Sequence, residues 1–271
     1  MAVMERALAD TQRAFDSVAV DYDRSNAGNP VLCAMRRRVI DTIVAHTPEG
    51  GRILDLGCGP GADEETLLRA GYSVTAIDWS AAMVDVTRKR LARAGFSGRA
   101  DVHHLGIQDL DRLPPAVFDT VCSNFGPLNC VPSLADAAPL IADRVRRGGR
   151  FIASVIGRVC PWEMALYAGR GDWTRLKVRF ARHAAPVPLS EHTVWTRYYT
   201  PRAFARVLAR SGFELVSIRG LGVLVPPPYM EAFAARHPAL VARLQQLEDL
   251  AGGWPGVRHL GDHFLIVMRK T

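Results

Sequence analysis

The sequence lacks any uninterrupted run of about 18 apolar residues, the length that a membrane-spanning helix needs. Residues 1–15 are charged and helical in pattern, without the apolar centre of a secretory signal. No two cysteines form a C-x-x-C pair, and no pair of histidines completes a zinc set, so we expect neither a disulfide framework nor a metal site. These absences predict a reduced, cytoplasmic protein. The cysteines are Cys33, Cys58, Cys122, Cys130 and Cys160.

Lysine is nearly absent as well, and the only lysines are Lys89, Lys177 and Lys270. The net charge of +7 and the isoelectric point of about 9.5 therefore come from arginine. The arginine blocks at 36–38 and 144–150 are typical of solvated helix faces, so we expect no nucleic-acid partner. The sequence also has no internal repeat and no low-complexity tract, and 48% hydrophobic residues are enough for one large core.

What the sequence does contain is a glycine cluster between an apolar strand and a helix. Residues 54–61 read Leu-Asp-Leu-Gly-Cys-Gly-Pro-Gly. Glycines 57, 59 and 61 let the backbone turn tightly and approach a ligand without a Cβ in the way. A second apolar strand ends at Asp78, about 20 residues after the glycines, where a carboxylate is well placed to accept hydrogen bonds from ribose hydroxyls. The pattern predicts an adenosine-type cofactor across the ends of two parallel strands.

Two classes of cofactor fit this pattern. Gly57, Gly59 and Ala62 satisfy the loose G-x-G-x-x-G/A fingerprint of dinucleotide binding. However, Asp55 lies in the strand that enters the loop, where it would repel a pyrophosphate and attract an ammonium group. The loop also follows about fifty residues of helical sequence, and no Tyr-x-x-x-Lys pair exists for a nicotinamide-dependent oxidoreductase. These details favour a cofactor with a positively charged end.

Residues 54–61 together with Asp78 closely resemble the class I S-adenosylmethionine (SAM) dependent methyltransferases. The run Phe-Asp-Ser-Val-Ala-Val-Asp-Tyr-Asp at 15–23 resembles a segment of the ubiquinone/menaquinone-type enzymes and their small-molecule relatives, in which the tyrosine often lines the cofactor cleft. The resemblance implies a Rossmann-like α/β fold with a seven-stranded, mostly parallel sheet, an antiparallel last strand, helices on both faces and a lid. It also implies SAM as cofactor and S-adenosylhomocysteine (SAH) as product.

The resemblance assigns expected roles around the cofactor. Asp55 and the loop amides would meet the methionine end, Asp78 the ribose, and Trp79 the adenine. After the third strand, relatives usually carry an aspartate where this chain has Gly106, which leaves the neighbouring residues to read the adenine edge. The expected cofactor-binding residues are Tyr22, Asp55, Gly57, Cys58, Gly59, Asp78, Trp79, Ile107, Gln108, Asn124 and Phe125.

The expected organisation is a single class I methyltransferase domain over residues 1–271. Its parts are an N-terminal helical cap at 1–48 with a loop near 25–30, a SAM-binding core at 49–156, an acceptor lid at 157–200, and a C-terminal part at 201–271 that carries a helical insertion at 226–260. The expected strands are 52–57, 73–78, 100–105, 117–123, 149–156, 213–222 and 262–269, and the expected core helices lie near 61–70, 80–95, 133–146 and 201–211.

A general base is required only if the acceptor is a hydroxyl, because the methyl group on the sulfonium is already activated. Asn129 stands where many relatives carry a histidine. The base candidates therefore come from the lid, and they are His183, His192, Tyr198 and Glu163, with His103 and His104 as weaker alternatives. The lid is also rich in aromatic residues, including Trp162, which would suit an apolar or aromatic acceptor, although a role in the core explains them as well.

The sequence thus predicts methyl transfer from SAM to a small molecule, with O- or C-methylation of a lipophilic or aromatic metabolite favoured. Two alternatives remain at this stage, an NAD(P)-dependent oxidoreductase with a Rossmann fold and a methyltransferase acting on RNA or protein. The sequence identifies neither the acceptor nor the oligomeric state.

Overall fold

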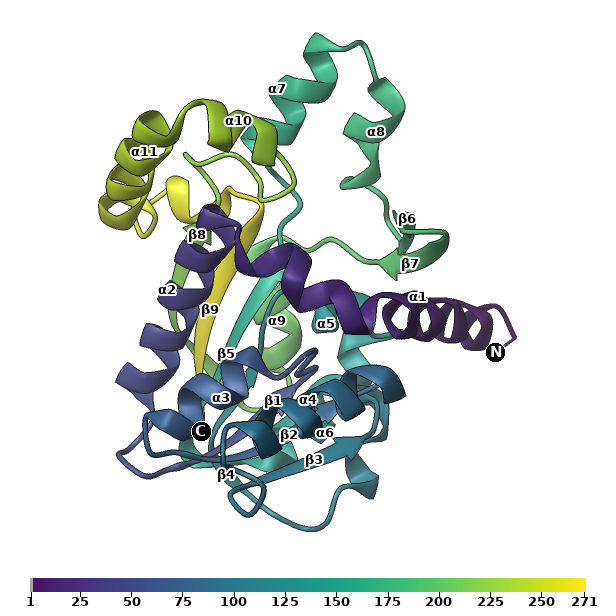
Figure 1. Cartoon of the computed structure of the whole chain (residues 1–271), viewed down its shortest axis with the longest axis vertical. Helices are drawn as coiled ribbons and strands as arrows, with labels where there is room; N and C mark the ends of the chain where they lie inside the picture. The colour runs from purple at the N-terminus through teal and green to yellow at the C-terminus, as the bar shows by residue number, and fades with distance from the viewer. Residues whose placement is uncertain (1) are drawn as a thin grey trace.

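A seven-stranded sheet forms the centre of the molecule (Figure 1). The computed structural model describes residues 2–271, and for residues 2–4 and 23–27 it describes the backbone alone. The strands of the sheet are β1 (Arg52–Leu56), β2 (Ser73–Asp78), β3 (Ala100–His104), β4 (Phe118–Ser123), β5 (Val145–Ile156), β8 (Phe213–Leu221) and β9 (His263–Lys270). Each overlaps a strand expected from the sequence.

The order of the strands explains where a ligand can bind. The sheet runs β3-β2-β1-β4-β5-β9-β8, and β9 is antiparallel to both of its neighbours. From β1, the chain adds β2 and β3 on one side and β4 and β5 on the other, so the strand order reverses between β1 and β4. In open α/β sheets the crevice at such a reversal, beyond the carboxyl ends of the strands, is the usual ligand site.

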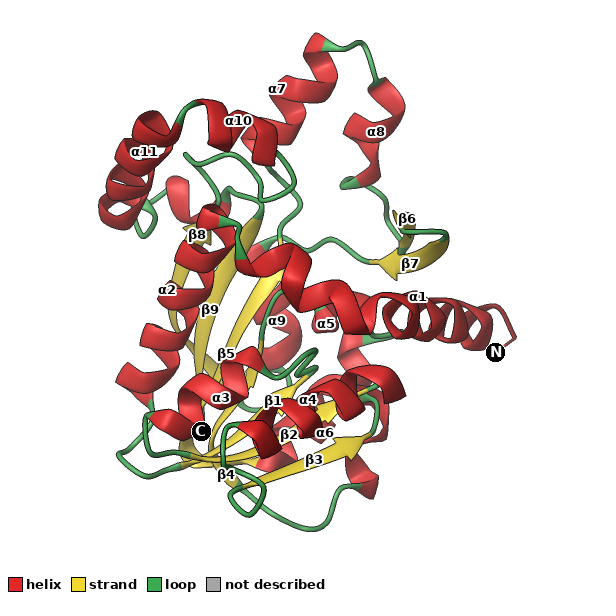
Figure 2. Ribbon diagram, viewed as in Figure 1, coloured by secondary structure: helices red, strands yellow, loops and turns green. Residues whose placement is uncertain are grey.

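Helices cover both faces of this sheet (Figure 2). One face carries α2 (Pro30–His46), α3 (Ala62–Arg69) and α4 (Ala81–Arg93), and the other carries η1 (Ile107–Arg112), α6 (Leu134–Arg144) and α9 (Pro201–Ala209). Neighbouring residues on β1 point to opposite faces of the sheet. Ile53 packs on the face that carries α2, α3 and α4, Leu54 packs on the other face, and both are fully buried. The apolar runs expected for strands that are buried on both sides are therefore present.

The N-terminal helix differs from the sequence prediction in its extent. Helix α1 (Ala2–Ala27) continues through the first half of the stretch predicted as a loop, and only Gly28 and Asn29 separate it from α2. Asn29 begins α2 by accepting a hydrogen bond from the Leu32 amide at 3.0 Å. Figure 1 shows α1 crossing the molecule above the carboxyl ends of the central strands.

Two insertions form the upper part of the molecule in Figure 1. The first contains α7 (Pro161–Gly169), α8 (Trp173–Val178) and a hairpin of β6 (Ala185–Leu189) and β7 (His192–Thr196), which lies beside α1. The second contains α10 (Glu231–Arg236), α11 (Pro238–Ala251) and η2 (Val257–His259). The single helical stretch predicted here is broken because Pro238 disfavours the helical conformation at His237. Across the described residues, no helix is long and apolar enough to cross a membrane.

Candidate active site

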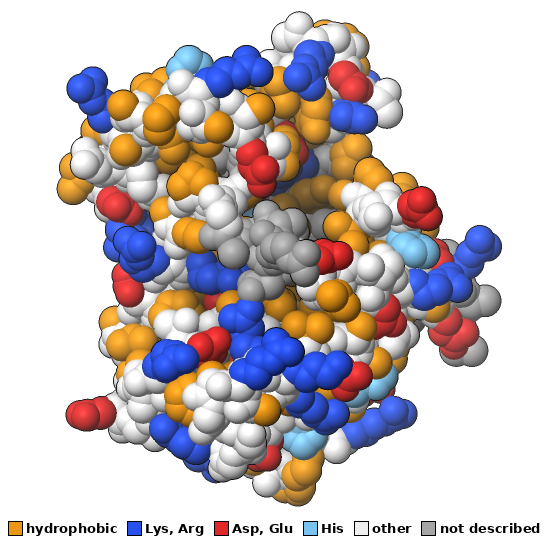
Figure 3. Space-filling model, in the orientation of Figure 1, with side chains coloured by type: hydrophobic (Ala, Val, Ile, Leu, Met, Phe, Trp, Pro, Cys, Tyr) orange, Lys and Arg blue, Asp and Glu red, His pale blue; other side chains and the backbone are white. Residues whose placement is uncertain are grey.

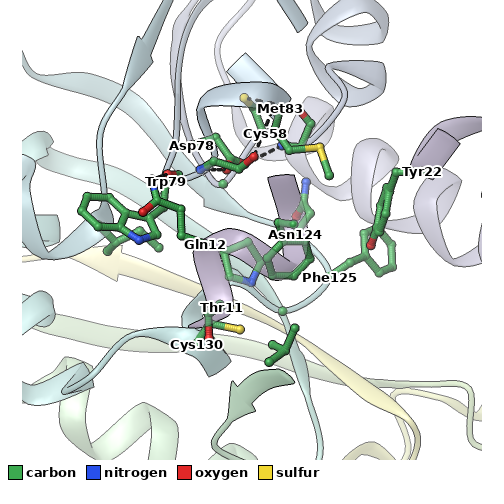
Figure 4. A pocket seen from close by; sticks show the side chains of 18 of the residues that line it. Thr11, Gln12, Tyr22, Cys58, Asp78, Trp79, Met83, Asn124, Phe125 and Cys130 are labelled. Atoms are coloured by element: carbon green, nitrogen blue, oxygen red, sulfur yellow. Dashed lines mark hydrogen bonds between the residues drawn. The ribbon is translucent and has the colours of Figure 1, made fainter. Parts of the chain in front are cut away.

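A cavity of about 320 Å³ lies at the carboxyl ends of β1, β2 and β4, beneath α1 and the β6–β7 hairpin. In Figure 4, Trp79 and Tyr22 stand on opposite sides of the drawn side chains, with Asn124 and Phe125 between them. Every residue that the sequence predicted to bind the cofactor lines this cavity: Tyr22, Asp55, Gly57, Cys58, Gly59, Asp78, Trp79, Ile107, Gln108, Asn124 and Phe125.

The glycine loop gives the cavity its floor. Gly57 has a φ of 97°, and a Cβ there would lie 2.3 Å from Cγ of Pro127, so no other residue fits. Gly59 has a φ of 54°, and a Cβ there would meet no atom within 4 Å. The space above Gly59 is therefore open to a ligand, which can approach the backbone closely.

Asp78 joins the glycine loop to the next helix. One carboxylate oxygen accepts from the Gly59 amide and the other from the Ser80 amide, both at 2.8 Å. Ser80 in turn caps α4 by accepting from the Met83 amide at 3.1 Å. Burial raises the pKa of Asp78, and the two backbone hydrogen bonds oppose that effect. Each oxygen has a second lone pair, so the carboxylate can still accept from two hydroxyl groups of a ligand.

The wall around Trp79 is fixed by contacts from distant segments. The Trp79 carbonyl accepts from Nε2 of Gln12 at 2.9 Å and lies 3.0 Å from Nε2 of His104. The indole Nε1 is buried and has no hydrogen-bond partner among the described residues. Nearby, a Cβ at Gly106 would lie 2.1 Å from Nε2 of Gln108. The glycine that replaces the usual aspartate therefore makes room for the glutamine side chain.

Acidic groups gather beneath the loop. Asp55 is 2% exposed, and burial raises its pKa to about 6, opposed by a contact with Glu64. Glu64 is fully buried, and burial raises its pKa well above the usual range. Asp63 is paired with Arg36, whose Nε lies 3.3 Å from Oδ1. A cationic ligand group placed here would relieve the mutual repulsion of these carboxyl groups.

Asn124 and Phe125 complete this end of the cavity. Nδ2 of Asn124 donates to Asp63 at 2.9 Å, while its Oδ1 is buried without a partner among the described residues. Phe125 has a φ of 60°, rare for a non-glycine residue, and its amide donates to the Ser154 hydroxyl at 2.7 Å. The unpartnered amide oxygen and the carboxyl groups form an acceptor set that fits the ammonium of SAM, and Asp78 fits its ribose.

The opposite wall is apolar. It is built by α1, the β6–β7 hairpin and residues that follow β4 and end β5. The hairpin is held to α1 because Thr11 accepts from the Trp195 amide at 3.1 Å, and Asp10 accepts from the Trp195 indole at 3.3 Å. The apolar lining residues on this side are Leu8, Phe15, Val131, Ile156, Val187, Pro188, Leu189 and Val194.

The predicted bases lie elsewhere. His183 and His192 are exposed, and Tyr198 is buried outside the cavity with its ring 5.3 Å from the Arg179 guanidinium carbon. Burial raises the pKa of Tyr198 to about 12. Glu163 pairs with Arg179, and Trp162 donates to the Leu224 carbonyl at 2.9 Å. Within 157–200, the hairpin therefore lines the cavity, whereas the helices that carry many of the predicted aromatics do not. The abundance of histidine and tyrosine in a segment does not indicate which way each points.

Several lining residues were not anticipated from the sequence. Arg36 was treated as part of a solvated block, yet it reaches the cavity beside Asp63. Gln12 reaches it from α1, and Asp16 on the same helix accepts from the hydroxyl of Ser80, which lines the cavity, at 2.5 Å. Helical spacing along α1 was the only available signal for these residues. Within the described part of the chain, no group of three His, Cys, Asp or Glu side chains is arranged to hold a metal.

Comparison with known proteins gives matches to methyltransferases. The family model described as a methyltransferase domain matches residues 53–149. The chain is 30% identical over 173 residues to the ubiquinone biosynthesis O-methyltransferase of Aromatoleum aromaticum, which covers 64% of this chain and 68% of that protein.

Solved structures share the fold over nearly the whole chain. The 1,6-didemethyltoxoflavin-N1-methyltransferase of Burkholderia thailandensis has a TM-score of 0.61 at 18% identity, covering 97% of this chain and 88% of that one. The geranyl diphosphate C-methyltransferase of Streptomyces coelicolor has a TM-score of 0.61 at 16% identity, covering 98% of each chain. Both structures contain S-adenosylhomocysteine.

These matches exclude the nicotinamide-dependent alternative, because the shared segment contains the glycine loop and Asp78 around which the cavity is built. The curated relative and the solved neighbours act on small molecules, as their names state. The chain belongs to the class I SAM-dependent methyltransferases, and its cofactor is SAM.

Proposed function

We propose that the chain transfers the methyl group of SAM to a hydroxyl group of a lipophilic aromatic small molecule. The observation that carries this proposal is the contrast between the two walls of one cavity. One wall offers glycines, carboxyl groups and an unpartnered amide oxygen, whereas the other offers aliphatic and aromatic side chains. A cavity with a polar end and an apolar end suits a charged cofactor beside an apolar acceptor.

On the cofactor side, each residue has a role that its position supports. Asp78 accepts from the ribose hydroxyls, and Trp79, Ile107 and Gln108 surround the adenine. Asp55, Asn124 Oδ1 and the amides of the glycine loop hold the ammonium and carboxylate of the methionine end, with Arg36 as the cation nearest the carboxylate. Tyr22 and Phe125 close that end. SAM supplies a methyl group on a positively charged sulfur, which needs no further activation.

On the acceptor side, the chain acts by alignment and by exclusion of water. Helix α1 and the hairpin place apolar side chains over the cavity, so an aromatic ring bound there displaces water from the path of the methyl group. Burial of an apolar chain on the acceptor would add about 0.8 kcal/mol per methylene group. The role of the chain is therefore to hold the acceptor oxygen in line with the methyl group.

The choice of an aromatic hydroxyl rests on two supports. The curated relative is a ubiquinone biosynthesis O-methyltransferase, and its match spans the cofactor loop and the following core. Among the described residues that line the cavity, Arg36 is the only cationic side chain, and it is already paired with Asp63. An acceptor with a diphosphate group would need more positive charge than this wall provides.

The test is turnover with radiolabelled SAM and a pair of catechols, 3,4-dihydroxybenzoate and a catechol that carries an apolar side chain. We expect a methyl ether and SAH in equal amounts, with a lower KM for the catechol that carries the apolar chain. Mass spectrometry of the product locates the methyl group. Transfer to carbon or nitrogen alone, or no transfer to either catechol, would contradict O-methylation.

A further inference from the structure

A buried imidazole–carboxylate pair stands at the start of β9, outside the roles described so far. Nδ1 of His263 lies 3.0 Å from Oδ2 of Asp262, and the two residues are 9% and 6% exposed. A carboxylate this close to one ring nitrogen favours the imidazolium that forms when the other nitrogen takes up a proton. This arrangement differs from that of the exposed histidines of the lid, for which no acidic partner is present among the described residues.

Asp262 is itself held in place and kept charged. Its Oδ1 accepts from Nη2 of Arg179 at 2.5 Å, and Arg179 also donates to the carbonyls of Gly157 and Asp262 at 2.8 and 3.1 Å. Glu163 binds the remaining side of the guanidinium. Burial alone would raise the pKa of Asp262, but the charges of His263 and Arg179 hold that pKa well below its usual range. The second carboxylate oxygen is the one that lies 3.0 Å from the imidazole.

The imidazole lies against the wall of the cavity. His263 pairs with Ile156 across β5 and β9, and directly paired residues share one face of a sheet. Ile156 lines the cavity. The His263 ring also packs edge-on against the ring of Phe125, which lines the cavity too, with centroids 5.6 Å apart. Nε2 has no partner among the described side chains and is not one of the fully enclosed atoms.

An approach to this point exists on the surface. Figure 3 shows the molecule hollowed between the α7–α8 segment above and α1 below, with hydrophobic side chains along the border of the hollow. Glu163 and Arg179 come from the segment above, and the cavity lies beneath α1.

We propose that His263, with the Asp262 carboxylate beside its ring, is the general base that takes the proton from the acceptor hydroxyl. This proposal rests on the proposed O-methylation. The O–H proton moves to Nε2, the freed oxygen lone pair forms the bond to the methyl carbon, and the carbon–sulfur electron pair remains on sulfur. The products are a methyl ether, SAH and an imidazolium, which later releases its proton to water.

Contact with the acceptor requires the Phe125 ring to turn aside, and the unusual backbone of Phe125 marks this residue as a constrained position.

A purely structural role is the alternative, in which the network only ties the insertion to the sheet. That role explains Arg179 and Glu163, since each has several internal partners. It predicts that substitution at His263 lowers stability without changing the pH dependence of catalysis. Among the described residues, the charged groups beside His263 include Asp262 and, behind it, Arg179, and Arg36 lies near the neighbouring Phe125, with its guanidinium carbon 5.8 Å from that ring centroid.

The test compares His263→Gln with His46→Gln, a change at the last residue of α2 where the imidazole Nδ1 lies 2.9 Å from the Thr42 carbonyl oxygen. With 3,4-dihydroxybenzoate, His263→Gln should lower kcat about 100-fold or more, the usual contribution of a general base. The Kd for SAH should stay within about twofold, because His263 is not assigned to the cofactor. The rising limb of kcat with pH should disappear in His263→Gln, whereas His46→Gln should behave as the wild type.

Asp262→Asn sharpens the result. Loss of the carboxylate removes the negative charge beside the imidazolium that forms during the reaction, so kcat should fall while the Kd for SAH stays within about twofold. An unchanged limb and kcat in His263→Gln would overturn the proposal while leaving O-methylation intact. Absence of catechol turnover in the wild type would overturn both this proposal and O-methylation.

Nuclear magnetic resonance gives a readout without turnover: the ring signals of His263 should shift when 3,4-dihydroxybenzoate is added to the SAH complex, and no shift would also contradict the assignment.

Discussion

The two walls of the cavity differ in how the chain builds them. The cofactor wall comes from short segments that directly follow strands, such as the loop after β1 and the turn after β2. The acceptor wall is assembled from α1 and the β6–β7 hairpin, which lie 184 residues apart in the Thr11–Trp195 contact. The comparison shows that cofactor chemistry is encoded in local sequence, whereas acceptor shape depends on tertiary contacts between distant segments.

The largest expected effect is on SAM affinity and concerns a residue of the cofactor wall. Asp78→Ala removes the acceptor of the Gly59 and Ser80 amides, which is also the proposed acceptor of the ribose hydroxyls. Hydrogen bonds to a charged group contribute about 1.5–3 kcal/mol, so the Kd for SAM should increase roughly 10- to 150-fold. Titration calorimetry of the folded variant measures this change. An affinity equal to that of the wild type would remove Asp78 from the cofactor site.

A pH series probes the acidic part of the cofactor wall. Because burial raises the pKa of Asp55 to about 6, the folded protein without ligand takes up a proton as the pH falls through that value. Because the folded state binds this proton more tightly than the unfolded state does, protonation of Asp55 stabilises the fold at low pH. This stabilisation is lost as the pH rises from about 4 to 6. Binding of an ammonium group requires the charged carboxylate, so the affinity for SAH should fall up to about tenfold per pH unit below 6.

Matched variants identify the titrating group. Asp55→Asn should abolish the pH dependence of SAH binding. Glu64→Gln should retain it, because burial raises the pKa of Glu64 well above its usual range and glutamine resembles the protonated acid. Equal pH profiles for Asp55→Asn and the wild type would place the effect elsewhere.

The smallest expected effect belongs to the acceptor wall. Val194→Ala removes two methyl groups from a residue of the hairpin that is 7% exposed and lines the cavity. A loss of about 1 kcal/mol of apolar contact should raise the KM for a catechol acceptor roughly fivefold. The Kd for SAM should change less than about twofold, and steady-state kinetics with calorimetry distinguish the two. A larger effect on SAM than on the acceptor would break the division between the walls.

The same division explains what the sequence could predict. The strand, turn and helix around Gly57 and Gly59 are one continuous segment, so their geometry follows from residue type and spacing. The position of Asp78 could be predicted because it ends β2, the strand that completes one strand–helix–strand unit with the glycine loop. Each strand of the main sheet was predicted for the same reason, because apolar runs bounded by glycine carry local information.

The parts that could not be predicted depend on contacts across long stretches of chain. Arg179 and Asp262 are 83 residues apart, and Arg36 and Asp63 come from different helices. The sequence showed the histidines of the lid but not their orientation, and it gave His263 no distinguishing spacing. The sequence does not show which charged residues form a pair, because folding brings the two members together from distant positions in the chain.

Helix α1 has a consequence for the kinetics of a catalytic cycle. Its 26 residues extend over about 39 Å, and it contacts both walls, through Gln12 to the Trp79 carbonyl and through Thr11 to Trp195. We expect displacement of this one helix to uncover both proposed sites at once. Exchange of SAH for SAM and release of the methylated product would then share a single opening event, whose rate would set an upper limit on turnover.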